Sequence, residues 1–223
     1  MTQERRKASG RAGSSRESAG PGRSGARRGW IVAGTVVGIA LVAFIVASFS
    51  AGGNESADGI RETAPVTVTG DPLPQYPETG TDPAVGLTLP DLEGVSFDGS
   101  PVSITNDGRA KVVLVVAHWC GVCRSEVTDY GSYFEQNGVP TNADWYTIST
   151  GVRSTADNYP PSAWLGEWPL PVLVDDEALT LLQAVGLSAY PFTVVVAPDG
   201  TVAGRAVGAV PIEALVEFTE QWG

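Results

Sequence analysis

Residues 111–123 read KVVLVVAHWCGVC and contain both cysteines of the chain. After its lysine, the run to Ala117 is continuously apolar and mostly β-branched, which is typical of a strand buried on both faces of a sheet. Cys120 and Cys123 follow directly, where we expect the next helix to begin. This order predicts two thiols at the junction between a buried strand and the first turn of a helix.

The position of the two cysteines favours thiol–disulfide exchange. A thiol at a helix N-terminus lies near unpaired backbone N–H groups, and their partial positive charge favours thiolate over thiol. Cys120 would occupy that position. Cys123 lies one turn later, where it can attack a mixed disulfide formed by Cys120. We therefore expect Cys120 to attack and Cys123 to resolve.

Two other interpretations of the cysteine pair are open. A closed structural zinc site takes four Cys or His ligands, whereas the chain has two cysteines and one histidine, so zinc would need a second chain or carboxylate ligands. A purely structural disulfide would close a loop so small that it would hardly constrain the unfolded chain. We expect neither a metal nor a cofactor.

The pattern on both sides of this region predicts strands alternating with helices. Gly94–Ile104 is expected to form a hairpin, because Asp98-Gly99 suits a turn with positive φ. Asp175-Asp176-Glu177 suits the start of a helix, where carboxylates meet unpaired N–H groups. Such alternation, ending in a hairpin, indicates an α/β fold with a mixed central sheet flanked by helices. The other expected elements are strands at 66–69, 111–117, 145–149, 171–174, 192–197 and 201–207, and helices at 120–137, 178–185 and 211–221.

The N-terminal part of the chain differs in composition from the rest. Residues 1–29 are rich in Arg, Ser, Gly and Ala, which predicts a disordered basic tail. Residues 30–49, WIVAGTVVGIALVAFIVASF, carry no charge and are long enough to cross a hydrocarbon core of about 30 Å as a helix. Basic residues before this span place the N-terminus in the cytoplasm. We expect a single-pass protein of the cell membrane whose thiols face away from the cytoplasm.

A cleaved signal peptide is the alternative for this apolar span, because Ser48-Phe49-Ser50 fits a small-x-small cleavage site. Signal h-regions usually run about 7–15 residues, which favours an uncleaved anchor here. Residues 50–83 are rich in Gly, Pro and acidic residues and are predicted to form a flexible linker. Residues 84–223 then form one domain of common size.

The charge balance excludes one class of partner. After the apolar span the chain has six basic and 23 acidic residues, a net charge of −17. Nucleic-acid binding needs a basic face, so we expect no nucleic-acid partner. We expect a monomer.

Three segments resemble the membrane-anchored thioredoxin-like family, whose best-known members are the TlpA- and ResA-type proteins. The resemblance covers residues 84–223 and implies a thioredoxin-like fold with an N-terminal hairpin, at 94–104, and a central insert, at 152–175. It also implies extracytoplasmic thiol reduction and cytochrome c maturation, with exported protein thiols, including apocytochrome c, as partners and a membrane thiol as electron donor. The matching segments are Leu89-Pro90-Asp91-Leu92-Glu93-Gly94, His118-Trp119-Cys120-Gly121-Val122-Cys123 and Tyr190-Pro191.

The resemblance adds four residues to the candidate site. It implies that Pro191 is a cis-proline beside the dithiol, that the backbone at Tyr190 pairs with a substrate strand, and that Trp119 serves packing and recognition. Glu126 matches the family's active-site glutamate. Held near the dithiol in poor solvent, its carboxyl would have a raised pKa and could move the proton of the resolving thiol. The residues alone leave open a trans Pro191 and an exposed Glu126.

The chain also departs from the family pattern. Leu114 stands where thioredoxin has a buried aspartate, and Thr128 stands where a proline is common. We expect His118 to face solvent at the rim of the site and assign it no chemistry. The aromatic residues of the insert (Tyr159, Trp164 and Trp168) either pack its core, which we favour, or form a recognition surface.

Two rival functions occur on related folds. Peroxidases of the redoxin group carry a threonine three residues before the reacting cysteine, where this chain has Ala117. An extracytoplasmic copper chaperone would have Cys-x-x-x-Cys spacing and a distant histidine, whereas His118 adjoins the motif. The sequence does not fix the direction of exchange, although Gly121-Val122 slightly favours a reductase over an oxidase.

Overall fold

The computed structural model describes residues 59–223. The predicted basic tail (1–29), the predicted membrane span (30–49) and the first part of the predicted linker (50–58) lie outside the described residues. Among residues 59–223, no helix combines the length and the apolar character that a membrane crossing requires.

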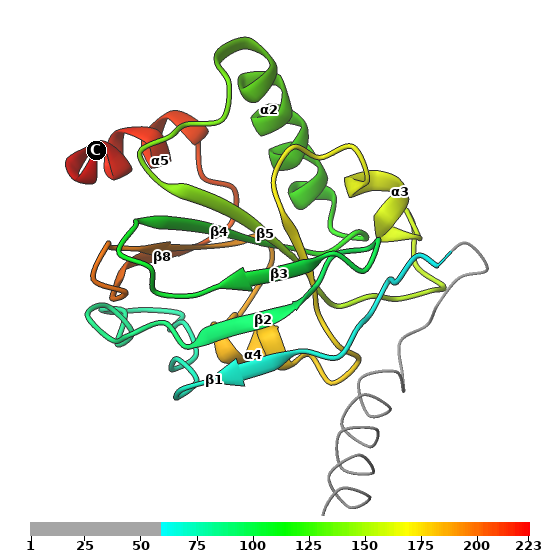
Figure 1. Ribbon diagram of the computed structural model, residues 1–223, viewed down its shortest axis with the longest axis horizontal. Coiled ribbons are helices and arrows are strands. Elements are labelled where there is room, and N and C mark those ends of the chain that lie inside the picture. Colours follow the sequence, from blue (N-terminus) through cyan, green and yellow to red (C-terminus); the bar gives the residue numbers. More distant parts are fainter. Residues whose placement is uncertain (1–58) are drawn as a thin grey trace, which may run out of the picture. The chain divides into compact units, whose positions relative to one another are not determined.

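Five strands form the central sheet, in the order β6-β5-β4-β7-β8 (Figure 1). Strands β4, β5 and β6 are parallel, and β7 and β8 are antiparallel to their neighbours. Every residue of β4 is buried, as its apolar sequence predicts. The predicted mixed sheet is confirmed. The bounds are Lys111–Val116 (β4), Asp144–Ser149 (β5), Val172–Val174 (β6), Phe192–Val196 (β7) and Val202–Val207 (β8).

Helices cover both faces of this sheet (Figure 1). Successive side chains of β4 point to opposite faces. Val112 and Leu114 therefore pack with α2 and α5, whereas Val113 and Val115 pack with α4 and with a second, smaller sheet. The helices are Gly121–Asn137 (α2), Pro161–Leu165 (α3), Thr180–Ala184 (α4) and Ile212–Thr219 (α5), and a 3-10 turn, η1, spans Glu220–Trp222.

The second sheet is antiparallel and contains the predicted hairpin. It is formed by β1 (Thr67–Thr69), β2 (Asp91–Val95) and β3 (Pro101–Ile104), with β2 in the middle. Gly99 has φ +83°, which glycine adopts at little cost, and the Asp98 carboxylate accepts a hydrogen bond from the backbone N–H of Ser100. The hairpin and its turn are therefore confirmed.

The prediction of a flexible linker is wrong for its described part, residues 59–83. Ala64 and Leu73 are buried, and β1 pairs with β2. The backbone N–H of Leu73 donates to the carbonyl of Ala184, and that of Tyr76 donates to the carbonyl of Gly186. Pairing with distant backbone orders this segment. The sequence predicted its strand at 66–69, which β1 confirms, but not the pairing of the residues around it.

Two carboxylates fasten the ends of this segment. Near its start, buried Glu62 accepts hydrogen bonds from the backbone N–H and the hydroxyl of Ser162, at the first turn of α3. Near its end, Asp82 pairs with Arg205 of β8, whose side chain is fully buried. Hydrogen bonding from Arg205, above all, lowers the pKa of Asp82. The ordered domain therefore begins well before residue 84.

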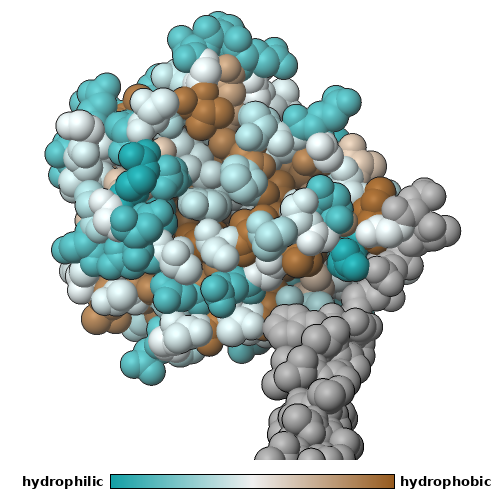
Figure 2. Space-filling view, viewed as in Figure 1, coloured by the Kyte–Doolittle hydropathy of each residue, from teal (hydrophilic) through white to brown (hydrophobic). Residues whose placement is uncertain are grey.

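The surface of the domain is polar, with dispersed apolar side chains. Figure 2 shows hydrophobic (brown) residues lying between hydrophilic (teal) ones on one face. Single exposed apolar residues are normal on soluble domains. The large exposed apolar residues are Val85, Leu87, Val122, Val139, Tyr159, Val207 and Phe218.

We predict that Asp82→Ala destabilises the oxidised protein by about 3–5 kcal/mol, because it leaves the buried guanidinium of Arg205 without its counter-charge. Asp144→Ala is the matched control. It removes the partner of Arg109 from an ion pair in which the arginine side chain is 52% exposed, and it should cost about 0–1 kcal/mol. Denaturant unfolding measures both losses. Equal losses would contradict the anchoring role of Asp82.

Candidate active site

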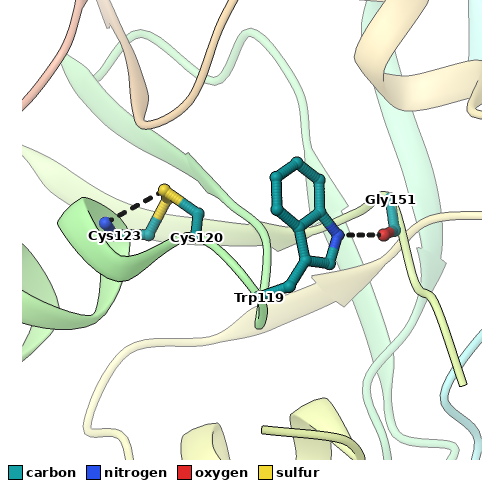
Figure 3. Close-up of a disulfide and its surroundings, with 4 residues drawn as sticks. All are labelled: Trp119, Cys120, Cys123 and Gly151. Atoms are coloured by element: carbon teal, nitrogen blue, oxygen red, sulfur yellow. Dashed lines mark hydrogen bonds between the residues drawn. A yellow bond between two sulfur atoms is a disulfide. The ribbon is translucent and has the colours of Figure 1, made fainter. Parts of the chain in front are cut away.

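Cys120 occupies the N-cap of α2, as the sequence predicts. Strand β4 ends at Val116, and the backbone N–H of Cys120 donates to the carbonyl of Ala117, which closes the turn into the helix. The sulfur of Cys120 accepts a hydrogen bond from the backbone N–H of Cys123, with 3.2 Å between the two atoms (Figure 3). The two cysteines form a disulfide, and their Cα atoms lie 5.3 Å apart.

The two sulfurs differ in their access to solvent. Cys120 is 9% exposed and Cys123 is 0% exposed. The residues between them are open: Gly121 has no neighbouring atom within 4 Å of an added Cβ, and Val122 is exposed. The open surface over Gly121 and Val122 therefore leaves room for a partner chain next to Cys120, the less buried cysteine of the pair. This asymmetry suits the attacking and resolving roles.

Trp119 and Tyr190 lie together beside the dithiol. The indole N–H of Trp119 donates to the carbonyl of Gly151 over 2.8 Å (Figure 3), and its ring meets that of Tyr190 edge to face at 5.4 Å. Both residues pack against the cluster that contains Cys120 and Cys123.

Pro191 lies close to the end of β4, because the register pairs Val115 with Phe192, the next residue along the chain. The peptide bond between Tyr190 and Pro191 is cis, as the resemblance implies. The structure thus gathers Trp119, Tyr190 and Pro191 near the cysteines.

Glu126 is buried, so the alternative of an exposed helix carboxylate is wrong. It is 3% exposed and shares the buried face of α2 with Cys123, one turn earlier. One carboxylate oxygen accepts a hydrogen bond from the backbone N–H of Val210 over 2.9 Å. Burial raises the pKa of Glu126 to about 7, although the bond from Val210 acts in the opposite direction. This carboxyl can therefore take up and release a proton near neutral pH.

His118 is buried, so the expectation that it faces solvent is wrong. Its Nδ1 lies 3.0 Å from the carbonyl of Asp157, and its Nε2 accepts a hydrogen bond from the backbone N–H of Arg153. These partners fix the neutral tautomer with the proton on Nδ1. The histidine ties the segment after β5 to the end of β4. The sequence did not predict the burial of His118, because its hydrogen-bond partners are backbone groups more than 30 residues away.

A second buried carboxylate, Asp175, was predicted only as a helix-terminal residue. It does cap α4, since it accepts a hydrogen bond from the backbone N–H of Leu181 over 2.8 Å. It also accepts one from the hydroxyl of Thr150 over 2.6 Å, and Thr150 acts to lower the pKa of Tyr190, against the larger effect of burial. Burial raises the pKa of Asp175. Asp175 and Thr150 both act on the pKa of Tyr190, and no local sequence pattern signals this proximity.

The aromatic residues of the insert divide between the two predicted roles. Trp168 packs against Phe134 of α2, and its indole N–H donates to the hydroxyl of Thr147. Trp164 is only partly buried and lies beneath the guanidinium of Arg124. The packing interpretation therefore holds for Trp168, although both tryptophans are partly exposed. Tyr159 is 42% exposed, and its ring meets that of His118 edge to face.

We predict that the pH dependence of stability reveals the raised pKa of Glu126. The folded protein keeps the Glu126 proton between pH 4.5 and about 7, whereas the unfolded chain releases it, so the stability of the wild type falls across this window. Across this window the wild type should lose on the order of 3 kcal/mol of unfolding free energy relative to Glu126→Gln, whose side chain does not titrate.

Denaturant unfolding of the oxidised proteins at pH 4.5 and pH 8 measures this difference. Glu135→Gln makes the same change at an exposed position of the same helix and serves as the control. A difference between the wild type and Glu126→Gln that stays constant with pH would contradict the raised pKa.

Comparisons with known proteins show the fold. No protein-family model matches the chain, and a search of curated proteins found no match. A DsbF homologue from Corynebacterium diphtheriae is 17% identical with a TM-score of 0.51, covering 68% of this chain and 99% of its own. A candidate protein disulfide isomerase from Bacteroides thetaiotaomicron is 17% identical with a TM-score of 0.50, covering 62% and 89%. The described domain therefore has a thioredoxin-like α/β fold.

Proposed function

We propose that this protein is a thiol–disulfide oxidoreductase that works outside the cytoplasm, as a reductase of disulfides in exported proteins. The observation that carries the proposal is the asymmetric cysteine pair at the start of α2. Cys120 is the more exposed cysteine, and Cys123 is fully buried one helical turn before a carboxyl whose pKa is about 7. Both structural neighbours described above bear names from disulfide chemistry, which agrees with this proposal.

The reaction proceeds in two exchange steps. The Cys120 thiolate attacks one sulfur of the substrate disulfide, so that a mixed disulfide forms and the other substrate sulfur leaves as a thiolate. Cys123 then loses its proton and attacks the sulfur of Cys120, which releases the second substrate thiolate and closes the Cys120–Cys123 disulfide. Two electrons pass from the dithiol to the substrate. A thiol donor at the membrane returns the dithiol to its reduced form.

Glu126 serves as the base for the second step. Cys123 has no access to solvent, so its proton needs an acceptor inside the protein. Glu126 lies one turn away on the same buried face, and its pKa of about 7 lets it accept a proton at neutral pH.

The location and the partners follow from the sequence. The apolar span 30–49, with basic residues before it and acidic ones after it, supports a membrane anchor with the domain outside the cytoplasm. The resemblance to TlpA- and ResA-type proteins makes apocytochrome c one candidate substrate. The rival role of copper chaperone is disfavoured by His118, because hydrogen bonds engage both of its ring nitrogens.

We predict that the two cysteine variants fail differently. Cys120→Ser should abolish reduction of a test disulfide, because no accessible sulfur remains. Cys123→Ser should form the mixed disulfide and stop there, giving a covalent protein–substrate adduct visible by mass spectrometry without reductant. An adduct formed by Cys120→Ser instead would reverse the assigned roles.

The direction of exchange is tested by the reduction potential of the full-length chain in glutathione buffers. A value near the thioredoxin end of the range, about −270 mV, supports a reductase. A value near the DsbA end, about −120 mV, would contradict it and indicate an oxidase.

We predict that the rate of the resolving step rises with pH through about 7, as Glu126 becomes ionised. Glu126→Gln should remove this dependence and slow the step by roughly 10- to 100-fold, at or below the usual contribution of a general base. Stopped-flow tryptophan fluorescence of the reduced protein with excess substrate measures the step. A pH profile identical in both proteins would exclude Glu126 from the proton transfer.

A further inference from the structure

The few basic side chains of the described domain differ in their partners. Residues 59–223 contain six lysines and arginines against 21 acidic residues. Three of the six form ion pairs remote from the cysteines, with Asp107, Asp144 and Asp82. Arg61 lies against Gly99, in the turn between β2 and β3. The remaining two, Arg124 and Arg153, lie beside the candidate active site.

Arg153 is held over the tryptophan that precedes the attacking cysteine. Its guanidinium carbon lies 3.9 Å from the centre of the Trp119 ring, within the range of a cation–π contact. The backbone of Arg153 is fixed by its hydrogen bond to His118, and the indole is fixed by its bond to Gly151. The side chain is exposed, so the edge of the guanidinium faces solvent.

Arg124 directly follows the resolving cysteine. Its guanidinium carbon lies 5.5 Å from the centre of the Trp164 ring. Trp119 and Trp164 both pack against the cluster that contains Cys120 and Cys123. Within the described part of the chain, no ion pair joins either arginine to a carboxylate. Two guanidiniums, each over the ring of a tryptophan that packs against the cysteine cluster, thus lie near the dithiol, and each carries its donors in a planar fork.

Guanidiniums presented in this way match carboxylates. The domain as a whole is strongly acidic, and its long-range field favours cations. At physiological ionic strength, however, that field is screened within about 8 Å, so groups that contact a bound substrate decide its preference. Arg124 and Arg153 thus bring two positive charges to the neighbourhood of the dithiol, although the carboxylates of Glu62, Asp176 and Glu177 line an adjacent cavity with Val152 and Ser154.

We propose that Arg124 and Arg153 bind carboxylates on the substrate, and that the substrates are protein disulfides flanked by acidic residues. The inference rests on the proposed function and names the substrate class for the same site. A substrate segment that crosses Gly121 to reach Cys120 brings its flanking residues within reach of the two arginines, and its carboxylates form charge-assisted hydrogen bonds with them.

The test uses the reduced full-length chain and three synthetic peptides. Each peptide carries one cysteine as a mixed disulfide with 2-mercaptoethanol, and the two residues flanking that cysteine are both Asp, both Asn or both Lys. The rate at which the protein reduces each peptide is divided by the rate at which dithiothreitol reduces the same peptide. This ratio removes the effect of peptide charge on the intrinsic reactivity of the disulfide.

The wild type should prefer the Asp peptide over the Asn peptide. Arg124→Gln and Arg153→Gln should each lower this preference by about two- to fivefold, the range expected of exposed charge pairs, and the double variant should abolish it. Raising the salt concentration should weaken it in the wild type. Arg109→Gln removes the same charge just before the start of β4, at the end of the strand away from the cysteines, and should leave the preference unchanged.

The outcomes separate this inference from the proposed function. Equal corrected rates for the three peptides, or a preference for Asp that survives in the double variant, would contradict the role of the arginines and leave the oxidoreductase intact. A chain that reduces none of the three peptides would contradict both.

Discussion

The position of the site depends on the burial of one strand, β4, at the centre of the sheet. All of its residues are buried, so its register with β5 and β7 is fixed by packing on both faces. Three segments meet where it ends. The turn after Val116 leads to Cys120, pairing with β7 brings Pro191 alongside, and the backbone N–H of Thr150 donates to the carbonyl of Val116. A shift of β4 would displace the sulfurs, the cis-proline and the support of Tyr190 together.

Two buried carboxyls lie near this junction, and their hydrogen bonds suit them to different work. Burial raises the pKa of both. Asp175 accepts four hydrogen bonds, from the hydroxyl of Thr150 and from the backbone N–H groups of Asp176, Leu181 and Leu182, so its position is fixed. Glu126 accepts a hydrogen bond from the backbone N–H of Val210 and lies beside the less accessible sulfur. The first carboxyl joins Thr150 to the first turn of α4, whereas the second can exchange protons.

Local sequence patterns predicted the features that depend on neighbouring residues alone. The continuous apolar run of β4 and the Asp-Gly turn of the hairpin each follow from neighbouring residues, and both are observed. The cysteine pair and Glu126 were found by spacing and by resemblance. Contacts between distant residues were missed. Among these are the ordering of residues 59–83, the burial of His118 and the proximity of Asp175 to Tyr190. In each case the interacting residues lie on different elements, so no local sequence pattern indicates the contact.

The ordered segment 59–83 has a practical consequence for anyone who isolates the domain. Because its composition is typical of a linker, the domain could be truncated just before residue 84, where the alternating pattern of strands and helices begins. That cut would remove β1 from the edge of β2, the Glu62 carboxylate from the first turn of α3 and the counter-ion of Arg205. Since α3 also presents Trp164, the damage would reach the neighbourhood of the cysteines. The smallest piece that retains these contacts starts no later than about residue 60, and recombinant boundaries are best chosen upstream of that point.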